Sequence, residues 1–286
     1  MTDTDGLHAG WVTTEGDDLY YEVRGNGKPL LMIPPAGGDG WQYSFVAEIL
    51  ADEYRVITFD RRGNARSTGH EPQNFEITQQ SRDAVAVLRA VGEQSAVVFG
   101  NSSGAVIALD MARTQPQAVR AVVAHEAPLA RLHPMARRWR RFFANVYATA
   151  FRFGPSLAAL RFMLGAQLPV AKMIRATAPV NRHRRASAVP YRSDKQAAQV
   201  LIEHELLPVS NYLPDINGIK RDDVKMFVAV SEYGLSRRAW YAQVAQILAQ
   251  GLNCELITLP GHHGSFMDMP SEFSAALRGV IDQAWA

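Results

Sequence analysis

The pattern G-N-S-S-G, centred on Ser102, separates an apolar run from a helical pattern and constrains the fold more than any other stretch of the sequence. The apolar run ends at Gly100, and a pattern rich in alanine, isoleucine and leucine continues to Arg113. A strand that turns directly into a helix at such a serine forms a sharp, strained elbow, which the small glycines allow. The pattern predicts that Ser102 is a nucleophile exposed above a sheet; the alternative is a turn built from small residues.

A second loop offers a partner for this serine. The segment P-P-A-G-G, residues 34–38, follows a short apolar stretch. Because proline has no N–H, the first donor that this loop can direct at Ser102 is that of Ala36. The N–H of Ser103 lies at the start of the expected helix, where negative charge is favoured. We expect Ala36 and Ser103 to form an oxyanion hole, with a merely stiff turn as the alternative interpretation of the loop.

The order of elements along the chain predicts an α/β fold. Apolar stretches expected to be strands alternate with helical patterns and lie at 19–24, 29–33, 55–59, 96–99, 119–124, 224–230 and 255–259. Continuous apolar strands of this kind are typical of a mostly parallel sheet that helices cover on both faces. We therefore expect a doubly covered, mostly parallel sheet.

The alternation breaks between residues 131 and 219, where no convincing strand is found and prolines punctuate the helical segments. We expect this insertion to cap the carboxyl ends of the strands, where ligands bind in open α/β sheets. The sequence thus divides into a core, residues 1–130 and 220–286, and a helical cap, residues 131–219.

Composition narrows the class of protein. A chain of 286 residues with 47% hydrophobic and 20% charged residues is typical of one large globular domain, or of a core with an insertion. The single cysteine, Cys254, excludes an internal disulfide and fits a reducing compartment. The acidic residues 1–5 precede no apolar stretch, so we expect no signal peptide, and apolar runs such as 142–151 are too short to span a membrane. We expect a cytoplasmic protein without stable membrane insertion.

Charge is divided unevenly between the two parts. Residues 131–195 contain 14 Lys or Arg and a single acid, Asp194, although the net charge of the whole chain is only +2. The favoured interpretation is a solvated basic face that pairs with an acidic core. The alternatives are steering of anionic substrates and contact with an anionic surface. Nucleic acid is not expected as a partner, because no aromatic-interleaved basic motif accompanies the charge.

A histidine pair lies just before the closing helix expected at 271–285. His263, one residue before Gly264, is the expected general base for Ser102, and His262 the expected neighbour on the surface or behind the base. No histidine has the spacing of a metal site, and no dinucleotide-binding glycine pattern is found, so we expect neither metal nor cofactor. Ordinary surface or cap positions are expected for the other histidines, such as His70, His133, His183 and His204.

At these positions the sequence resembles the α/β-hydrolase superfamily. The matching pieces are the elbow, F-D-R-R-G-N-A-R-S at 59–67 and P-G-H-H-G-S-F at 260–266, within 19–131 and 224–285. The resemblance implies an α/β-hydrolase fold, with His263 in the place of the family histidine. Many relatives carry His-Gly where this chain has Pro34-Pro35. We interpret the charged loop at 60–67 as a salt-bridged structural turn.

The resemblance leaves the position of the catalytic acid to be decided. The usual acid follows the strand at 224–230, yet the sequence there, S-E-Y-G, holds no Asp. A smaller branch, which includes haloalkane dehalogenases and macrolide-lactone hydrolases such as zearalenone hydrolases, takes the acid from the end of the preceding core strand. Glu126 occupies that place, and we expect it to orient His263. Glu232 and Asp268 are the alternatives, and a salt bridge to Arg131 is the structural alternative for Glu126.

These residues predict a serine hydrolase that cleaves a small-molecule carboxylic ester or lactone through a Ser102–His263–Glu126 triad and an acyl-enzyme. A serine at the elbow argues against dehalogenase and epoxide-hydrolase chemistry, since those relatives use aspartate there. Two other functions remain open: a carbon–carbon bond hydrolase, and a small-molecule receptor with little turnover. We expect a monomer or homodimer. The expected substrate pocket includes Gly37, Trp41, Asn101 and Pro128.

Overall fold

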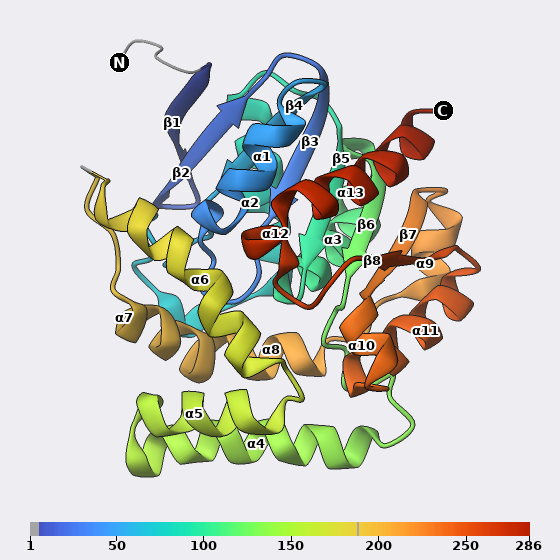
Figure 1. The fold of residues 1–286 in the computed structure, drawn as a ribbon. Coiled ribbons are helices and arrows are strands. Elements are labelled where there is room, and N and C mark those ends of the chain that lie inside the picture. Colours follow the sequence, from blue (N-terminus) through green and yellow to red (C-terminus); the bar gives the residue numbers. More distant parts are fainter. Residues whose placement is uncertain (1–5, 188) are drawn as a thin grey trace.

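The computed structural model describes residues 6–187 and 189–286 and contains one eight-stranded sheet in the order β1-β2-β4-β3-β5-β6-β7-β8 (Figure 1). Its strands are β1 (Leu7–Thr14), β2 (Asp17–Arg24), β3 (Lys28–Ile33), β4 (Tyr54–Phe59), β5 (Ala96–Asn101), β6 (Val119–His125), β7 (Lys225–Ser231) and β8 (Leu256–Leu259). β2 pairs antiparallel with β1 and β4, and β3 to β8 pair in parallel. The expected mostly parallel sheet is confirmed. Residues 1–5, on which the expectation about a signal peptide rested, lie outside the described residues.

The strand β1 is the one element of the sheet that the sequence analysis did not predict. It lies at the sheet edge, pairs with β2 along its whole length and exposes most of its side chains. An edge strand with little buried surface needs no apolar run, so the hydrophobic pattern could not reveal it.

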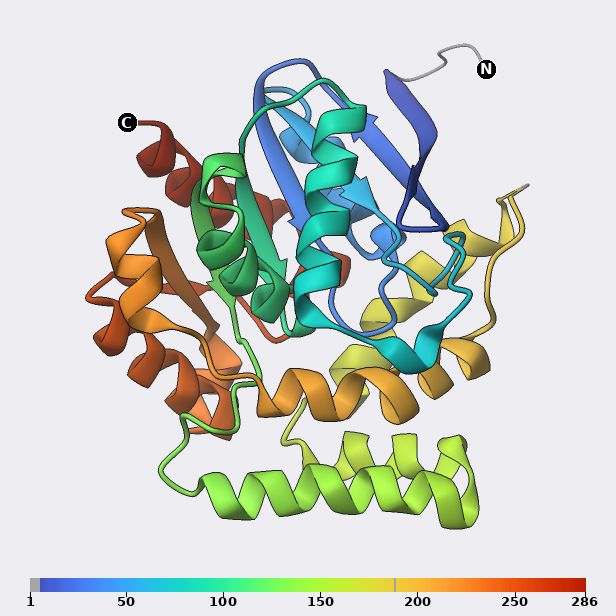
Figure 2. The same cartoon turned by 180° about the vertical axis from the view of Figure 1, so that it is seen from behind.

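Helices cover both faces of the sheet (Figures 1 and 2). One face carries α1 (Ser44–Leu50), α12 (Ser265–Asp268) and α13 (Pro270–Trp285), and the other carries α2 (Ile77–Ala90), α3 (Ser103–Thr114) and α11 (Trp240–Leu252). Each set packs its apolar side chains against the sheet in a buried cluster of its own. The short helix α10 (Glu232–Ser236) directly follows β7, and 3-10 turns occupy Gly40–Tyr43, Pro72–Asn74 and Pro116–Ala118.

Further helices lie below the sheet in Figure 1, at the end where the parallel strands finish. They are α4 (Ala136–Phe153), α5 (Pro155–Gly165), α6 (Val170–Arg185), α7 (Asp194–Gln199) and α8 (Leu206–Asn211), with a π-helical turn at Val200–Glu205 between the last two. The helix α9 (Ile216–Arg221) packs beside α11 and α3. Among the described residues of 131–219 no strand is found, although the division of the chain into core and cap stays a prediction.

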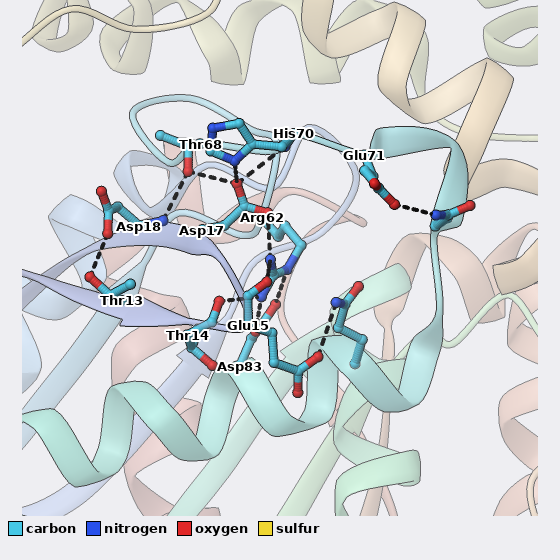
Figure 3. Close-up of polar contacts among 12 residues, drawn as sticks. Thr13, Thr14, Glu15, Asp17, Asp18, Arg62, Thr68, His70, Glu71 and Asp83 are labelled. Atoms are coloured by element: carbon cyan, nitrogen blue, oxygen red, sulfur yellow. Dashed lines mark hydrogen bonds and ion pairs between the residues drawn. The ribbon is translucent and has the colours of Figure 1, made fainter.

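The charged loop after β4 is a salt-bridged turn, as expected. Figure 3 shows Arg62 reaching Asp17, at the start of β2, and Asp83, on α2. Both nitrogens Nε and Nη2 of Arg62 donate to the Asp83 carboxylate, at 2.9 and 2.6 Å. Arg66 pairs with Asp60 in the same loop. These side chains tie the loop to the edge of the sheet.

The basic side chains of residues 131–195 are mostly exposed. Within the described part of the chain, Arg184 with Asp39 is the one ion pair recorded between this segment and a carboxylate outside it. The favoured interpretation, pairing with an acidic core, is therefore supported at this position only. None of the described helices is long and apolar enough to cross a membrane.

Candidate active site

The elbow at Ser102 is strained, as its sequence predicts. Ser102 connects β5 to α3 with φ 56° and ψ −119°, a conformation that non-glycine residues rarely adopt. A Cβ atom at Gly100 would lie 2.3 Å from the carbonyl oxygen of Gly104, and one at Gly104 would lie 2.2 Å from that of Ile33. Both glycines are therefore required by the close approach of α3 to β5 and β3. The Ser102 N–H donates to the His125 carbonyl at 2.9 Å, which fixes the elbow against β6.

Glu126 and His263 lie in direct contact behind this elbow. Nδ1 of His263 lies 2.5 Å from Oε2 of Glu126, and both side chains are almost fully buried. Glu126 follows β6 with φ 51°, and its N–H donates to the Ala229 carbonyl of β7 at 3.0 Å. The Asn101 amide donates to the His263 carbonyl at 3.3 Å. The end of β6 and the loop after β8 are thus both held beside the end of β5.

Each of the three candidate acids contacts a different group near the histidine loop. The Glu232 carboxylate is exposed and accepts the Gly261 N–H at 3.0 Å. The Asp268 carboxylate lies 3.1 Å from Nε2 of His262. Only Glu126, among these candidates, has an oxygen at hydrogen-bonding distance from the His263 ring. The geometry thus supports Glu126 over both alternatives.

Ser231 is a residue of the site that the sequence analysis missed. It ends β7, where the superfamily resemblance led us to look for an acid, and its N–H and hydroxyl both donate to Oε1 of Glu126, at 2.8 and 2.6 Å. A serine carries no charge to mark it in a sequence. Its role becomes visible only once β6 and β7 are seen to be neighbours.

Burial raises the pKa of the Glu126 carboxyl, but the adjacent His125 and the hydrogen bonds from His263 and Ser231 lower it further, to about 2. The carboxylate is therefore charged throughout the neutral range. His125 is fully buried, and this burial lowers its pKa to about 4, so its ring is neutral at pH 7. Its ring stacks 6.2 Å from that of His263, centroid to centroid.

A cavity of about 50 Å³ lies beside the elbow, and its wall includes Ser102, His263, Glu126, Ala36 and Ser103. Most of its other wall residues are apolar. They come from the cap segment and α11, and include Phe143, Phe162, Leu206, Val209 and Trp240. A larger cavity of about 290 Å³ also borders Ala36 and is lined by Gly37, Met173 and Arg184 among others.

The two expected oxyanion donors face the same cavity as Ser102. Ala36 lies in the loop after β3, and Ser103 is the first residue of α3, where backbone N–H groups have no partner within the helix. Within the described residues, no hydrogen bond to another protein atom is recorded for either N–H. Both N–H groups are thus available to bind an anion.

The family described as alpha/beta hydrolase fold matches residues 28–164. The chain is 26% identical over 280 residues to the uncharacterized hydrolase YraK of Bacillus subtilis, with 97% of each chain covered. It is 33% identical over 120 residues to the zearalenone hydrolase of Bionectria ochroleuca, which is 41% of this chain and 46% of that one. The solved structure of the enol-lactonase of Burkholderia xenovorans has a TM-score of 0.72 at 18% identity, covering 96% of this chain and all of that one.

The chain has the α/β-hydrolase fold and is similar to a hydrolase along almost its whole length. The expected fold class is confirmed, and the relatives support an enzyme of the hydrolase class. The similarity to zearalenone hydrolase extends over less than half of either protein.

Of the expected pocket residues, Pro128 lies on the wall of the cavity beside Ser102, and Gly37 lines the neighbouring cavity. Trp41 and Asn101 line neither, which corrects the expectation. The Trp41 ring is covered by the Arg66 guanidinium, 3.9 Å from its centroid. The Asn101 side chain is buried, and its amide group donates to the His263 carbonyl. Asn101 thus supports the histidine loop from behind.

His262 takes the second of its two expected places, behind the base, and His133, expected as an ordinary surface or cap residue, is buried. His262 is only 2% exposed, and its Nδ1 accepts the Gly264 N–H while Nε2 contacts Asp268, so it braces the loop from inside. His133 is buried at the entry to α4, where Nδ1 accepts the Met135 N–H. In the described residues, no group of three His, Cys, Asp or Glu side chains is arranged to hold a metal ion.

Proposed function

We propose that this α/β hydrolase cleaves carboxylic esters or lactones, with Ser102 as nucleophile, His263 as base and Glu126 as the acid that orients it. The observation that carries this proposal is the 2.5 Å contact between Nδ1 of His263 and Oε2 of Glu126 beside a strained elbow serine. A serine hydroxyl is a weak nucleophile on its own and needs such an adjacent base. A buried carboxylate on the far nitrogen fixes the tautomer and stabilises the imidazolium that forms.

The reaction proceeds in two halves. Ser102 Oγ attacks the carbonyl carbon while His263 takes its proton, and the N–H groups of Ala36 and Ser103 stabilise the negative oxygen that develops. His263 then donates this proton to the leaving oxygen, which leaves an acyl group on Ser102. Water attacks the acyl carbon with His263 again as base, and the acid product is released with Ser102 restored. For a lactone, the leaving oxygen remains attached to the same molecule.

The size of the two cavities suggests how a substrate lies. A cavity of about 50 Å³ is small beside those that hold drug-sized ligands, at roughly 300–1,000 Å³. We assign it to the acyl group of the substrate. The remainder of the substrate then extends past Ala36 toward the larger cavity. One solved structure of similar fold is that of an enol-lactonase, which makes lactones worth including among the first substrates.

Turnover of a panel of p-nitrophenyl esters and simple lactones tests this function. We expect hydrolysis that is lost in Ser102→Ala, with short acyl chains preferred. Turnover of a β-diketone in place of the esters would instead indicate carbon–carbon cleavage. Binding without turnover of any member would indicate a receptor, and either result would overturn the proposal.

A further inference from the structure

An ion pair between Arg61 and Glu205 lies buried at the cavity beside Ser102. Nη2 of Arg61 lies 2.8 Å from Oε1 of Glu205, and neither side chain is exposed to solvent. Arg61 comes from the loop after β4, and Glu205 is the last residue of the π-helical turn in the cap segment. A π-helical turn is rare and is frequently found at functional sites.

Arg61 also contacts the loop after β3 and the first residue of α3, which carry the two proposed oxyanion donors. Its Nη2 donates to the Pro35 carbonyl at 2.8 Å and to the Ser103 hydroxyl at 3.4 Å. The guanidinium is thereby held in one orientation, and it holds Oε1 of Glu205 in turn. Glu205 is fixed in place by these contacts.

The other carboxylate oxygen of Glu205 has no hydrogen-bond partner among the described residues, and neither do Nε and Nη1 of Arg61. Glu205 lies on the cavity wall, where apolar side chains such as Leu201, Leu206 and Phe162 surround it. A buried acceptor without a partner is costly, and a ligand that supplies a donor recovers that cost. The largely apolar cavity wall thus includes a residue with a buried, unpaired acceptor.

The charge of the pair indicates the kind of donor. Arg61 neutralises Glu205, so the pair carries no net charge, and a cationic ligand would bring an uncompensated charge into an apolar cavity. A second anion at Oε2 would be repelled by the carboxylate. A neutral O–H donor is neither cationic nor anionic, and its small size suits the cavity.

We propose that Glu205, held by Arg61, selects ester or lactone substrates whose small acyl group carries a hydroxyl. This inference rests on the proposed function for its assignment of the acyl group to this cavity. A hydrogen bond to a charged acceptor in such a site changes selectivity by about tenfold or more, because a substrate without the hydroxyl leaves Oε2 unpaired.

The test compares kcat/KM for p-nitrophenyl butyrate and p-nitrophenyl 3-hydroxybutyrate. The wild type is expected to prefer the hydroxylated ester by about tenfold or more after correction for the intrinsic reactivity of each ester. Glu205→Gln replaces the carboxylate that would accept the substrate hydroxyl with an amide, and it removes the charge that pairs with Arg61. This variant is therefore expected to lose the preference for the hydroxylated ester. Glu203→Gln is the matched control, since it makes the same change in the same turn but off the cavity wall, and it should keep the preference.

Glu205→Gln leaves Arg61 buried without a counter-charge and can fail to fold for that reason. The double variant Arg61→Met with Glu205→Leu removes both charges at similar volume and serves in that case. It is expected to prefer the unsubstituted butyrate. Retention of the hydroxyl preference in either variant would overturn the proposal.

Binding to Ser102→Ala separates this inference from the proposed function. Calorimetry with butyramide and 3-hydroxybutyramide needs no turnover, and we expect tighter binding of the hydroxylated amide by about tenfold. Equal binding, or no binding of either amide, contradicts the role of Glu205. Ester hydrolysis that survives in Ser102→Ala contradicts the proposed function instead.

Discussion

His263 and Glu126 lie 137 positions apart in the sequence, yet Nδ1 of the histidine lies 2.5 Å from Oε2 of the glutamate. The contact forms because β6 and β7 are neighbours and the loop after β8 returns to the end of β5. Ser231, at the end of β7, donates two hydrogen bonds to the other oxygen of Glu126. The place where a superfamily acid was first sought thus holds a residue that binds Glu126.

Replacement of this carboxylate by an amide tests the role of Glu126. Glu126→Gln keeps the shape but removes the charge that stabilises the imidazolium, so we expect kcat for ester hydrolysis to fall by about 10⁴-fold. Glu232→Gln, the matched control, changes an exposed carboxylate that accepts only the Gly261 N–H, and should change kcat little. A large loss in Glu232→Gln and none in Glu126→Gln would move the acid to the end of β7.

His125 predicts a specific dependence of stability on pH. Burial lowers its pKa from 6.5 to about 4 in the folded state, so the unfolded chain binds a proton that the folded chain rejects. The contribution to stability is therefore complete above about pH 6.5 and is lost as pH falls toward 4, by an amount on the order of 3 kcal/mol. In His125→Leu this part of the slope should disappear from the free energy of unfolding measured in urea. Identical slopes for the two proteins would contradict the account.

Protonation of the Glu126 carboxylate affects the free energy of unfolding at a lower pH than protonation of His125 does. Its pKa is lowered to about 2 in the folded state from 4.5, so its contribution is present above about pH 4.5 and is lost as pH falls toward 2. Between pH 6.5 and 4.5 the slope is little affected by Glu126, and burial raises the pKa of Asp39 to about 6 in both proteins, so the difference between wild type and His125→Leu reports His125.

The turn after β4 is expected to stabilise the fold through Arg62. Arg62→Met leaves Asp83 buried with its bidentate partner removed, and we expect a loss of about 3–5 kcal/mol in the free energy of unfolding. Arg82→Met, on the same helix as Asp83, breaks an exposed pair with Glu15 and should cost at most about 1 kcal/mol. Chemical denaturation measures the free energy of unfolding of both variants. Equal losses would contradict a larger contribution from the buried pair of Arg62 and Asp83.

The exposed basic residues of the cap segment predict steering of anionic substrates. Arg184 and Arg192 line the larger cavity, and most of the segment's basic side chains are open to solvent. For a phenyl acetate whose leaving group carries a carboxylate, kcat/KM should fall as salt screens these charges. The methyl ester of that carboxylate is the neutral control and should respond less. Equal salt dependence of the two esters would exclude steering.

The sequence predicted those parts of this hydrolase whose conformation is determined by a few neighbouring residues. The elbow at Ser102 and the loop at His263 are each encoded within a few residues, because glycines and a strand–helix junction leave little choice of conformation. The choice of Glu126 needed knowledge of which strands are neighbours, and it rested on the usual adjacency of consecutive strands together with the family resemblance. The edge strand β1 carries too little buried surface to leave a pattern.

The buried pair of Arg61 and Glu205 could not be predicted from the sequence. The two residues are 144 positions apart, and a π-helical turn breaks the helical period that would place Glu205 on a face. The expectation that Trp41 lines the substrate pocket was wrong because it, too, depends on a contact with a residue from another segment of the chain. An aromatic residue near the elbow loop is a reasonable pocket residue in sequence, but Arg66 stacks on its ring and covers it.

Covalent labelling of Ser102 tests the central claim most directly. A serine-directed phosphonate should add one group to the wild-type protein, with the adduct on Ser102 in peptide mass spectra and loss of ester hydrolysis at the same rate. Ser102→Ala, shown to be folded by circular dichroism, should remain unlabelled and inactive. Labelling of Ser102→Ala at the wild-type rate, or inactivation with the adduct on another residue, would contradict the assignment of Ser102 as the nucleophile.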